Sequence, residues 1–286
     1  MKKILLLGHT GKMGLALQKI LAPDYRLVGV NSSNFDAADF EQVAALVREQ
    51  KPELIINAIA FQGIDRCEAE PEAAFRLNTL FPGLLARICE ERQITLVHFS
   101  TDAVFADAGE GFCTENNLPA PLHLYGVTKY GGDCLVSSNC RQHYICRIPI
   151  LFGESRVESQ FVEKMLARLR GDNGAIRVAA DIVSSPSYSF DIASRVRGLL
   201  HDGAPFGTYH LANEGAASLY ELMAEIAANL IPGAVVEKAS SRDFPSVGRK
   251  NIHTPLRSVR IESLRPWREA VRDYCCRLQA GAGNDD

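Results

Sequence analysis

Short apolar runs alternate with amphipathic stretches through the first half of the chain. Runs that predict strands lie at residues 2–7, 27–30, 54–58, 95–100 and 144–147. Between them, apolar residues three or four positions apart predict helices at residues 11–21, 37–50, 71–92 and 125–139, the third of these bent near Pro82. This alternation predicts an α/β fold in which a doubly wound parallel sheet carries helices on both faces.

The pattern becomes looser after residue 152. Helices are predicted at residues 160–170, 188–201, 219–229 and 266–278, and short strands at 208–211 and 235–237. Residues 239–258 predict a loop that carries several basic side chains. We therefore expect a sheet domain over residues 1–152 and a smaller lobe over residues 153–286, with elements of the second half able to return to the sheet.

Composition and charge narrow the classes of partner. The chain has 286 residues, a formal net charge of -3 and no basic tract, which argues against nucleic acid or an anionic membrane as the main partner. Its apolar runs are far shorter than the roughly 20 residues of a membrane-spanning helix. Eight cysteines are scattered without a C-x-x-C pair, which favours reduced thiols and a cytoplasmic protein.

A glycine motif of the form G-x-x-G-x-x-G follows the first predicted strand and opens the first helix. Its residues are Gly8, Thr10, Gly11, Lys12, Met13 and Gly14, with His9 between the first two. Glycine lets a phosphate approach the backbone, and a helix N-terminus supplies free N–H groups and a positive dipole end. In this position the motif predicts a dinucleotide-binding domain of Rossmann type over residues 1–152.

The end of the second predicted strand bears on the choice of cofactor. It reads Asn31-Ser32, two residues that we expect to contact the cofactor, and it has no acid to pair with a ribose 2'-hydroxyl. Lys12 could instead meet a 2'-phosphate, although a solvated lysine at a helix start is an equal explanation. We expect NADP(H) to be favoured, with NAD(H) as the alternative.

Tyr125 and Lys129 form a Y-x-x-x-K pair, which a helix places on one face. A phenol with its usual pKa of about 10 is a poor acid at neutral pH, and a neighbouring ammonium favours its ionised form. Tyr125 could give a proton to a carbonyl oxygen, and Lys129 could hold the nicotinamide ribose. At the end of the fourth predicted strand, Ser100 and Thr101 both offer a hydroxyl that could polarise that carbonyl.

These motifs together resemble the extended short-chain dehydrogenase/reductase superfamily. The resemblance is closest to the dTDP-4-dehydrorhamnose reductase family, which also includes the regulatory β subunit of methionine adenosyltransferase. It is carried by N-A-I-A at residues 57–60, S-T-D-A-V-F at 100–105 and P-L-H-L-Y-G-V-T-K at 121–129, and it covers nearly the whole chain.

The resemblance implies an NAD(P)H-dependent reductase that acts on the 4-keto group of a nucleotide-linked deoxysugar, such as dTDP-4-dehydrorhamnose in dTDP-L-rhamnose biosynthesis. It places the catalytic hydroxyl, tyrosine and lysine on Thr101, Tyr125 and Lys129, so Thr101 is preferred to Ser100. It places further cofactor contacts at Asp36, which would face the adenine, and at Ala58, Ile59 and Ala60.

Substrate contacts are expected from both halves of the chain. They are Ser100, Asp102, Ile150, Ser187, Arg249 and Arg257. The two arginines, with Lys250, could meet a diphosphate, and a solvated loop explains them equally well. The rhamnose reductases carry tryptophan where this chain has Ile150, and R-I-P-I-L at 147–151 instead resembles the regulatory β subunits.

Several alternatives stay open. One is a regulatory subunit that binds NADP without catalysing a reaction, and another is an epimerase or dehydratase. Ala103 after Asp102 argues against a dehydratase, because that class usually places a carboxylate pair there. Some bacterial members of the family bridge a dimer through a metal held by glutamates. Ala16 stands at one of those positions, so no metal is expected, while a homodimer stays open.

Overall fold

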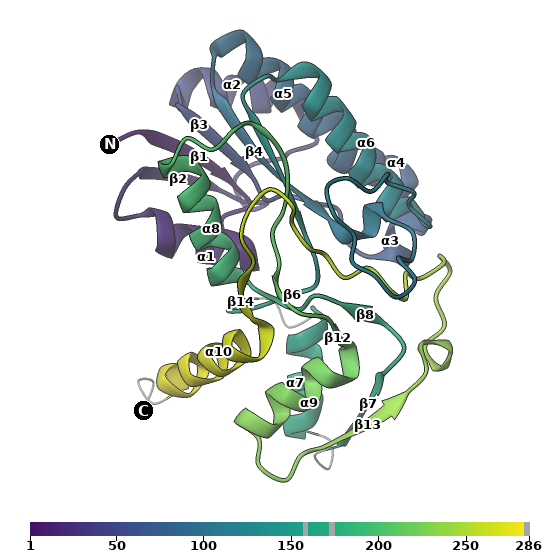
Figure 1. The fold of residues 1–286 in the computed structure, drawn as a ribbon. Helices are drawn as coiled ribbons and strands as arrows, with labels where there is room; N and C mark the ends of the chain where they lie inside the picture. The colour runs from purple at the N-terminus through teal and green to yellow at the C-terminus, as the bar shows by residue number, and fades with distance from the viewer. Residues whose placement is uncertain (157–159, 172–174, 283–286) are drawn as a thin grey trace.

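The computed structural model describes residues 1–156, 160–171 and 175–282. Its centre is a sheet of six parallel strands in the order β10-β5-β4-β3-β1-β2 (Figure 1). These strands are β1 (Lys3–Leu7), β2 (Arg26–Val30), β3 (Leu54–Asn57), β4 (Thr95–Thr101), β5 (His143–Ile148) and β10 (Gly207–His210). Because β1 lies between β2 and β3, the sheet is wound in both directions from β1, which confirms the predicted fold class.

Helices cover both faces of the sheet (Figure 1). On one face, α1 (Lys12–Leu21) packs against α8 (Ser189–His201). On the other face, α5 (Phe81–Arg92) packs against both α2 (Phe40–Gln50) and α6 (Leu124–Asn139). Their apolar side chains meet those of the strands in two buried cores, one on each side of the sheet.

The helix predicted over residues 71–92 is interrupted in the structure. It divides into α4 (Pro71–Phe75), a π-helical turn η1 (Arg76–Leu80) and α5, with Pro82 in the first turn of α5. Proline fits this place because the first turn needs no N–H donor, whereas inside one continuous helix it would break a hydrogen bond. The short helix α3 (Ile64–Ala69) was not predicted, since six residues carry too little periodicity.

The second half forms a small lobe of short strand pairs and helices. Strand β7 (Ala175–Ala179) pairs in parallel with β13 (Val235–Ala239), and α7 (Phe161–Gly171) and α9 (Leu219–Leu230) pack beside them. The shorter pairs are β6 (Leu151–Phe152) with β9 (Ser187–Tyr188), β8 (Val183–Ser184) with β12 (Ala217–Ser218), and β11 (Asn213–Glu214) with β14 (Leu264–Pro266). The remaining elements of the second half are the turn η3 (Ser241–Asp243) and the helix α10 (Trp267–Ala282). In the first half, the turn η2 (Asp102–Val104) directly follows β4.

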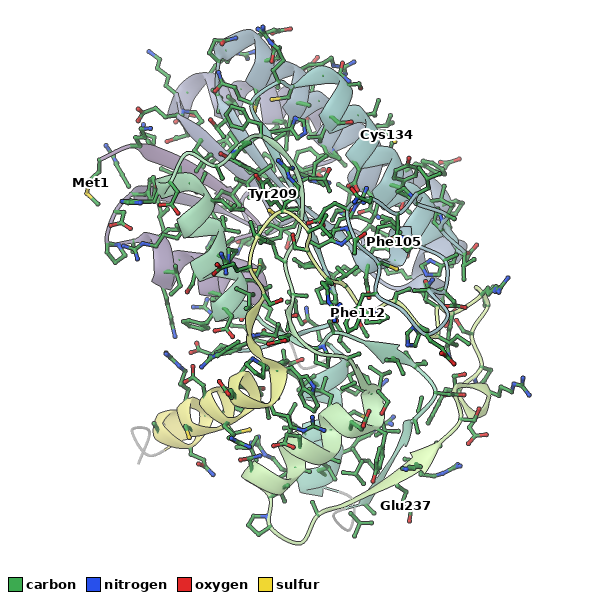
Figure 2. All side chains as sticks on the ribbon, in the orientation of Figure 1. Met1, Phe105, Phe112, Cys134, Tyr209 and Glu237 are labelled. Atoms are coloured by element: carbon green, nitrogen blue, oxygen red, sulfur yellow. The ribbon has the colours of Figure 1, made fainter. Side chains whose placement is uncertain are left out.

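Two elements of the second half return to the sheet. Strand β10 extends the sheet beyond β5, and α8 covers α1. Tyr209 of β10 is 2% exposed and packs on Tyr144 of β5, with 6.0 Å between the ring centroids; Figure 2 labels it among the side chains over the sheet. One edge of the sheet and one covering helix therefore come from beyond residue 152. Within the described residues, no helix combines the length and apolarity needed to cross a membrane.

Candidate active site

A cleft of about 590 Å³ opens at the carboxyl ends of the sheet strands. In a doubly wound sheet, ligands bind at this end, where the winding direction changes. The walls from the first half are Gly11–Gly14, Ala58–Ala60, Gln62–Ile64, Phe99–Ala103, His123, Tyr125, Lys129 and Ile148–Leu151. The walls from the second half are Gln160, Phe161, Ile182–Ser184, Leu219, Lys250, Asn251 and Thr254.

Each glycine of the motif has its own reason to lack a side chain. Gly8 has φ +85°, which other residues rarely adopt, and a Cβ there would lie 3.2 Å from the Ala58 backbone. At Gly14, a Cβ would lie 2.2 Å from the Gly8 carbonyl oxygen, so α1 could not approach β1 as closely. Gly11 has ordinary room around it and lines the cleft. The loop thus presents a bare backbone and the first turn of α1 to the cleft.

The amine of Lys12 is held by Leu151 and by Glu163 of the second half of the chain. Nζ lies 2.9 Å from Glu163 Oε1 and donates to the Leu151 carbonyl oxygen at 3.0 Å, and the side chain is 5% exposed. Burial lowers the pKa of Lys12, and the adjacent Glu163 raises it. The expected contact of Lys12 with a 2'-phosphate loses its support, because this ammonium already has a carboxylate partner.

The end of β2 forms a polar turn beside the glycine loop. Asn31 Nδ2 donates to Thr10 Oγ1 at 3.3 Å and so joins the two segments. Ser32 and Asp36 are exposed, and Asp36 Oδ1 accepts from the Ala38 N–H at 2.8 Å. These four polar residues lie outside the cleft lining, so their contacts with an adenosine stay predictions.

Tyr125, Lys129 and Thr101 come together on one wall of the cleft. The first two are one turn apart on α6, and Thr101 ends β4. Tyr125 is hydrogen-bonded with Thr101. Lys129 is 1% exposed and donates from Nζ to the Phe99 carbonyl oxygen at 2.6 Å. A phenol, a hydroxyl and an ammonium thus surround the place where a reacting group could sit.

Burial changes the pKa values of both Tyr125 and Lys129. It raises the pKa of Tyr125, while the hydrogen bond with Thr101 acts in the opposite direction. Burial also lowers the pKa of Lys129 to about 8, and the nearby Asp133 carboxylate raises it. At neutral pH the phenol therefore keeps its proton, and the lysine titrates close to neutral.

Asp102 uses both carboxylate oxygens inside the protein. Oδ1 accepts from Thr101 Oγ1, and Oδ2 accepts from Ser184 Oγ and Thr254 Oγ1, each at 3.0 Å. The three hydroxyls belong to β4, β8 and the loop before β14. Asp102 lines the cleft, and its carboxylate ties the sheet to the second half and orients Thr101. Its expected contact with substrate stays a prediction.

The other expected substrate residues fall into two groups. Ser100 and Ile150 line the cleft. Ser187 is fully buried, and its hydroxyl donates to the Ser185 carbonyl oxygen at 2.9 Å, so it is not available to a ligand. Arg249 is exposed and lies outside the cleft lining.

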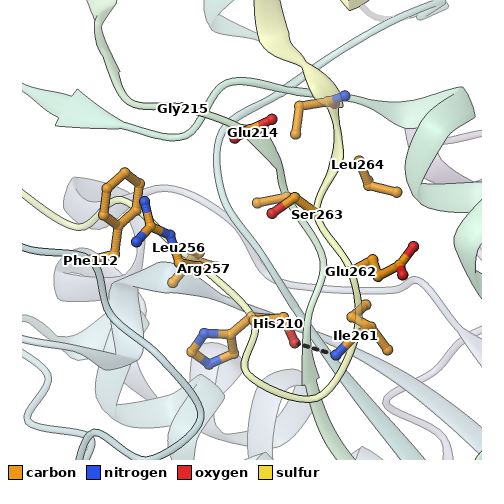
Figure 3. Close-up of a pocket in the computed structure, with 13 residues that line it drawn as sticks. Phe112, His210, Glu214, Gly215, Leu256, Arg257, Ile261, Glu262, Ser263 and Leu264 are labelled. Atoms are coloured by element: carbon orange, nitrogen blue, oxygen red, sulfur yellow. Dashed lines mark hydrogen bonds between the residues drawn. The ribbon is translucent and has the colours of Figure 1, made fainter.

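Arg257 lies in a different and much smaller pocket, beside β11 and β14 (Figure 3). Its guanidinium carbon is 4.0 Å from the ring centroid of Phe112. The reason is a bridge between Leu256 and Cys113, next to which the Arg257 N–H donates to the Cys113 carbonyl oxygen at 3.0 Å. This pairing anchors Arg257 beside Phe112 and outside the cleft lining, so its expected contact with a diphosphate in the cleft loses its support.

The wall residues missed in the sequence include His123, Asn251 and Thr254. His123 caps α6, because its Nδ1 accepts the Gly126 N–H at 3.2 Å; its other nitrogen therefore carries the proton and donates to Asn251 Oδ1 at 2.9 Å. A polar residue before a helix is a recognisable capping signal. The partners of Asn251 and Thr254 lie more than a hundred positions away, and no local pattern reveals them.

Comparisons with known proteins agree on one family. The family model for the RmlD substrate binding domain matches residues 1–280. The dTDP-4-dehydrorhamnose reductase of Aggregatibacter actinomycetemcomitans is 27% identical over 96% of this chain and 98% of that protein. The spore coat polysaccharide biosynthesis protein SpsK of Bacillus subtilis is 28% identical over 96% and 97%. A crystal structure of dTDP-4-dehydrorhamnose reductase from Bacillus anthracis in complex with NADP superimposes with a TM-score of 0.89, at 26% identity over 96% of this chain and 99% of that one.

Proposed function

The chain belongs to the family of the RmlD substrate binding domain, and from this we propose that it is an NAD(P)H-dependent reductase of a nucleotide-linked deoxysugar. The observation that carries the proposal is the meeting of Thr101, Tyr125 and Lys129 in one cleft with the glycine loop. The volume of that cleft, about 590 Å³, lies within the range of roughly 300–1,000 Å³ that is usual for ligand sites.

The cleft suits a nicotinamide dinucleotide. Gly11 leaves open the space that a Cβ would fill, and the first turn of α1 offers N–H groups to a diphosphate. Ala58 to Ala60 supply a wall with short side chains, and Tyr125 and Lys129 would hold the nicotinamide ribose. When bound, the nicotinamide supplies the hydride. The relative from Bacillus anthracis, whose structure contains NADP, supports this assignment.

In the proposed reduction, Tyr125 donates its phenolic proton to the substrate carbonyl oxygen as negative charge develops there. The raised pKa of Tyr125 keeps this proton in place before the substrate binds. The Lys129 ammonium stabilises the phenolate that remains. Thr101, oriented by Asp102, holds the phenol through its hydrogen bond.

The finer proposal names a 4-keto sugar on dTDP, with dTDP-4-dehydrorhamnose as the first substrate to test. The relative from Aggregatibacter supports it by name, whereas SpsK, at similar identity, is named for spore coat polysaccharide biosynthesis. The test is oxidation of NADPH or NADH with a panel of 4-keto sugars on dTDP and UDP. Fastest turnover with dTDP-4-dehydrorhamnose is expected. Turnover with a different sugar would overturn the finer proposal alone, and turnover with none would overturn the reductase.

A second candidate is an NADP-binding regulatory subunit without a reaction of its own. Ile150 favours it, because this side chain lines the cleft where the resemblance to rhamnose reductases leads one to expect an aromatic ring. Calorimetry separates the two candidates. A reductase binds NADP and also dTDP or a dTDP-sugar, whereas the regulatory subunit binds NADP alone.

Lys250→Met is expected to weaken the binding of dTDP about tenfold, or about 1.4 kcal/mol. Three lysines line the described part of the cleft, and Lys12 and Lys129 are already held by Glu163 and by the Phe99 carbonyl oxygen. Among the described residues, Lys250 donates to the carbonyl oxygens of Ser241 and Phe244 and forms no ion pair, so its charge can serve a diphosphate. Calorimetry with NADP present measures the effect. Arg257→Ala is the control, since its guanidinium lies in the other pocket; an equal loss in both variants would contradict the assignment.

Lys12→Met is expected to leave the ratio of dissociation constants for NADPH and NADH within about twofold of the wild-type ratio. The reason is that the Lys12 ammonium is bound to Glu163 and Leu151 rather than free to meet a 2'-phosphate. Fluorescence titration of both cofactors measures the ratio in one variant, so that any loss of packing affects both titrations alike. A tenfold loss for NADPH alone would restore Lys12 as the residue that recognises the phosphate.

A further inference from the structure

A cluster of buried polar side chains adjoins Lys129. It contains Asp133 of α6, Arg147 of β5, His98 of β4 and Asn57 of β3, which are 3%, 6%, 1% and 0% exposed. The proposed chemistry has so far used none of these four side chains. Burying a charged group costs folding free energy unless the charge is paired, so the pairing of these four side chains is described first.

The carboxylate of Asp133 is fixed on one side only. Its Oδ2 accepts from Arg147 Nε at 3.0 Å. Its Oδ1 has no hydrogen-bond partner among the described residues and lies 4.0 Å from His98 Nε2, which also has none. Burial raises the pKa of Asp133, and Arg147 and the nearby Ser100 hydroxyl lower it. Within the described part of the chain no close hydrogen bond fixes Oδ1, so this oxygen acts mainly through its charge.

His98 does not neutralise this carboxylate. Asn57 Oδ1 accepts the Ile59 N–H at 3.1 Å, which fixes the amide, so Asn57 Nδ2 is the donor to His98 Nδ1 at 3.2 Å. The His98 proton is then on Nε2. Burial, and then Lys129, lower the pKa of His98 well below its usual value, so the ring is neutral.

Asp133 stands on the same helix face as the proposed catalytic pair. Tyr125, Lys129 and Asp133 are each four positions apart on α6. The Lys129 ammonium has three N–H donors, and the Phe99 carbonyl oxygen takes one. The Asp133 carboxylate raises the pKa of Lys129 against the effect of burial. The other nearby carboxylate, Asp102, is already bound by three hydroxyls.

We propose that Asp133 is a positioning residue, whose carboxylate keeps the buried Lys129 charged and directed toward Tyr125 while Arg147 holds that carboxylate in place. The inference rests on the proposed function, because Asp133 acts only through the pair of Tyr125 and Lys129. The titratable and charged groups that face this pair are Asp133 on α6 itself, His98 on β4, Asp102 on η2, Arg147 on β5 and Cys67 on α3.

The test compares Asp133→Asn with Arg147→Met. Both variants break the same ion pair, but only the first removes the carboxylate. The protonation of Lys129 is followed by NMR of the full chain labelled with ¹³C at the lysine Cε atoms, and Lys129→Met identifies the signal. In Asp133→Asn the titration midpoint of Lys129 should fall by about one pH unit or more, as expected when a nearby opposite charge in a buried cluster is removed. In Arg147→Met, where the carboxylate remains although Arg147 no longer holds it, the midpoint should fall less than in Asp133→Asn.

Activity gives a second measurement. The alkaline limb of the pH profile of kcat should move to lower pH by the same amount in Asp133→Asn, while KM changes little. Equal NMR midpoints in wild type and Asp133→Asn, or an equal fall in both variants, would overturn the proposal. If Asp133→Asn does not fold because Arg147 is left unpaired, Asp133→Asn combined with Arg147→Met removes that charge and should still show the lowered midpoint. The NMR midpoint needs no substrate, so its result is distinct from a failure of the reductase assay.

Discussion

Tyr125→Phe should lower turnover by roughly 100-fold or more, equivalent to about 2.7 kcal/mol of transition-state stabilisation. The substitution removes one oxygen, the proton donor, and leaves the ring that stands beside His123 with 6.1 Å between their centroids. Lys129 and Thr101 keep their places, since Lys129 donates to the Phe99 carbonyl oxygen and Thr101 to Asp102. Steady-state turnover of NADPH with the preferred 4-keto sugar measures the loss.

Cofactor affinity should fall far less than turnover in Tyr125→Phe, because the glycine loop and Lys129 keep their places and only one hydroxyl near the nicotinamide ribose is lost. Tyr130→Phe is a matched control: it removes the same oxygen from the same helix at a position outside the cleft lining. Turnover close to wild type in Tyr125→Phe, or an equal loss in Tyr130→Phe, would show that the phenol of Tyr125 is not the proton donor.

Gly14→Ala should destabilise the fold by about 3 kcal/mol or more, at the upper end of the cost of overpacking. The added Cβ would lie 2.2 Å from the Gly8 carbonyl oxygen and 2.6 Å from His9 backbone atoms. These atoms belong to the backbone, so no side-chain rotation relieves the contact, and α1 must move away from β1. Denaturant unfolding followed by circular dichroism measures the change.

Gly11→Ala is the matched control for Gly14→Ala. It should leave stability nearly unchanged and weaken the binding of NADP. Its Cβ would lie 3.5 Å from the Gly8 carbonyl oxygen, an ordinary contact, and its φ of -72° suits alanine. Stability should change by less than about 0.5 kcal/mol. The methyl group would enter the cleft, so the affinity for NADP should fall at least tenfold, or about 1.4 kcal/mol. Unchanged affinity would contradict a diphosphate at this loop.

Much of the sheet was predictable because the pattern that indicates each strand lies within a few neighbouring residues. Each of the first five strands is a short apolar run, and each run is followed by a helical period. The strand over residues 208–211 was also expected, and the structure places β10 at residues 207–210. What the sequence did not specify was its partner, because the pairing of β10 with β5 joins segments some sixty residues apart. Strand β7 was missed, since five residues with exposed positions give little signal.

In the cleft, too, residues in local motifs were predictable and contacts between distant segments were not. The glycine loop, Tyr125 and Lys129 lie in short motifs whose spacing fixes their mutual placement, and the structure brings them together with Thr101. The contacts that could not be predicted join distant segments of the chain. Lys12 is held by Glu163, which is 151 positions away, and Asp102 by Thr254, which is 152 positions away. No periodicity or motif encodes such partners.

The return of α8 and β10 to the sheet limits how the chain can be divided for engineering. A fragment that stops at Phe152 would leave β5 as an open edge strand and expose the apolar face of α1 that α8 covers. A chimaera that exchanged everything after residue 152 would therefore replace part of the sheet together with the lobe. The part of the lobe that can be exchanged consists of two separate segments. One contains α7 and β7, the other contains α9 and β13, and α8 and β10 between them are kept. Grafts built on that boundary would vary the outer wall of the cleft while every strand of the sheet keeps its native neighbours.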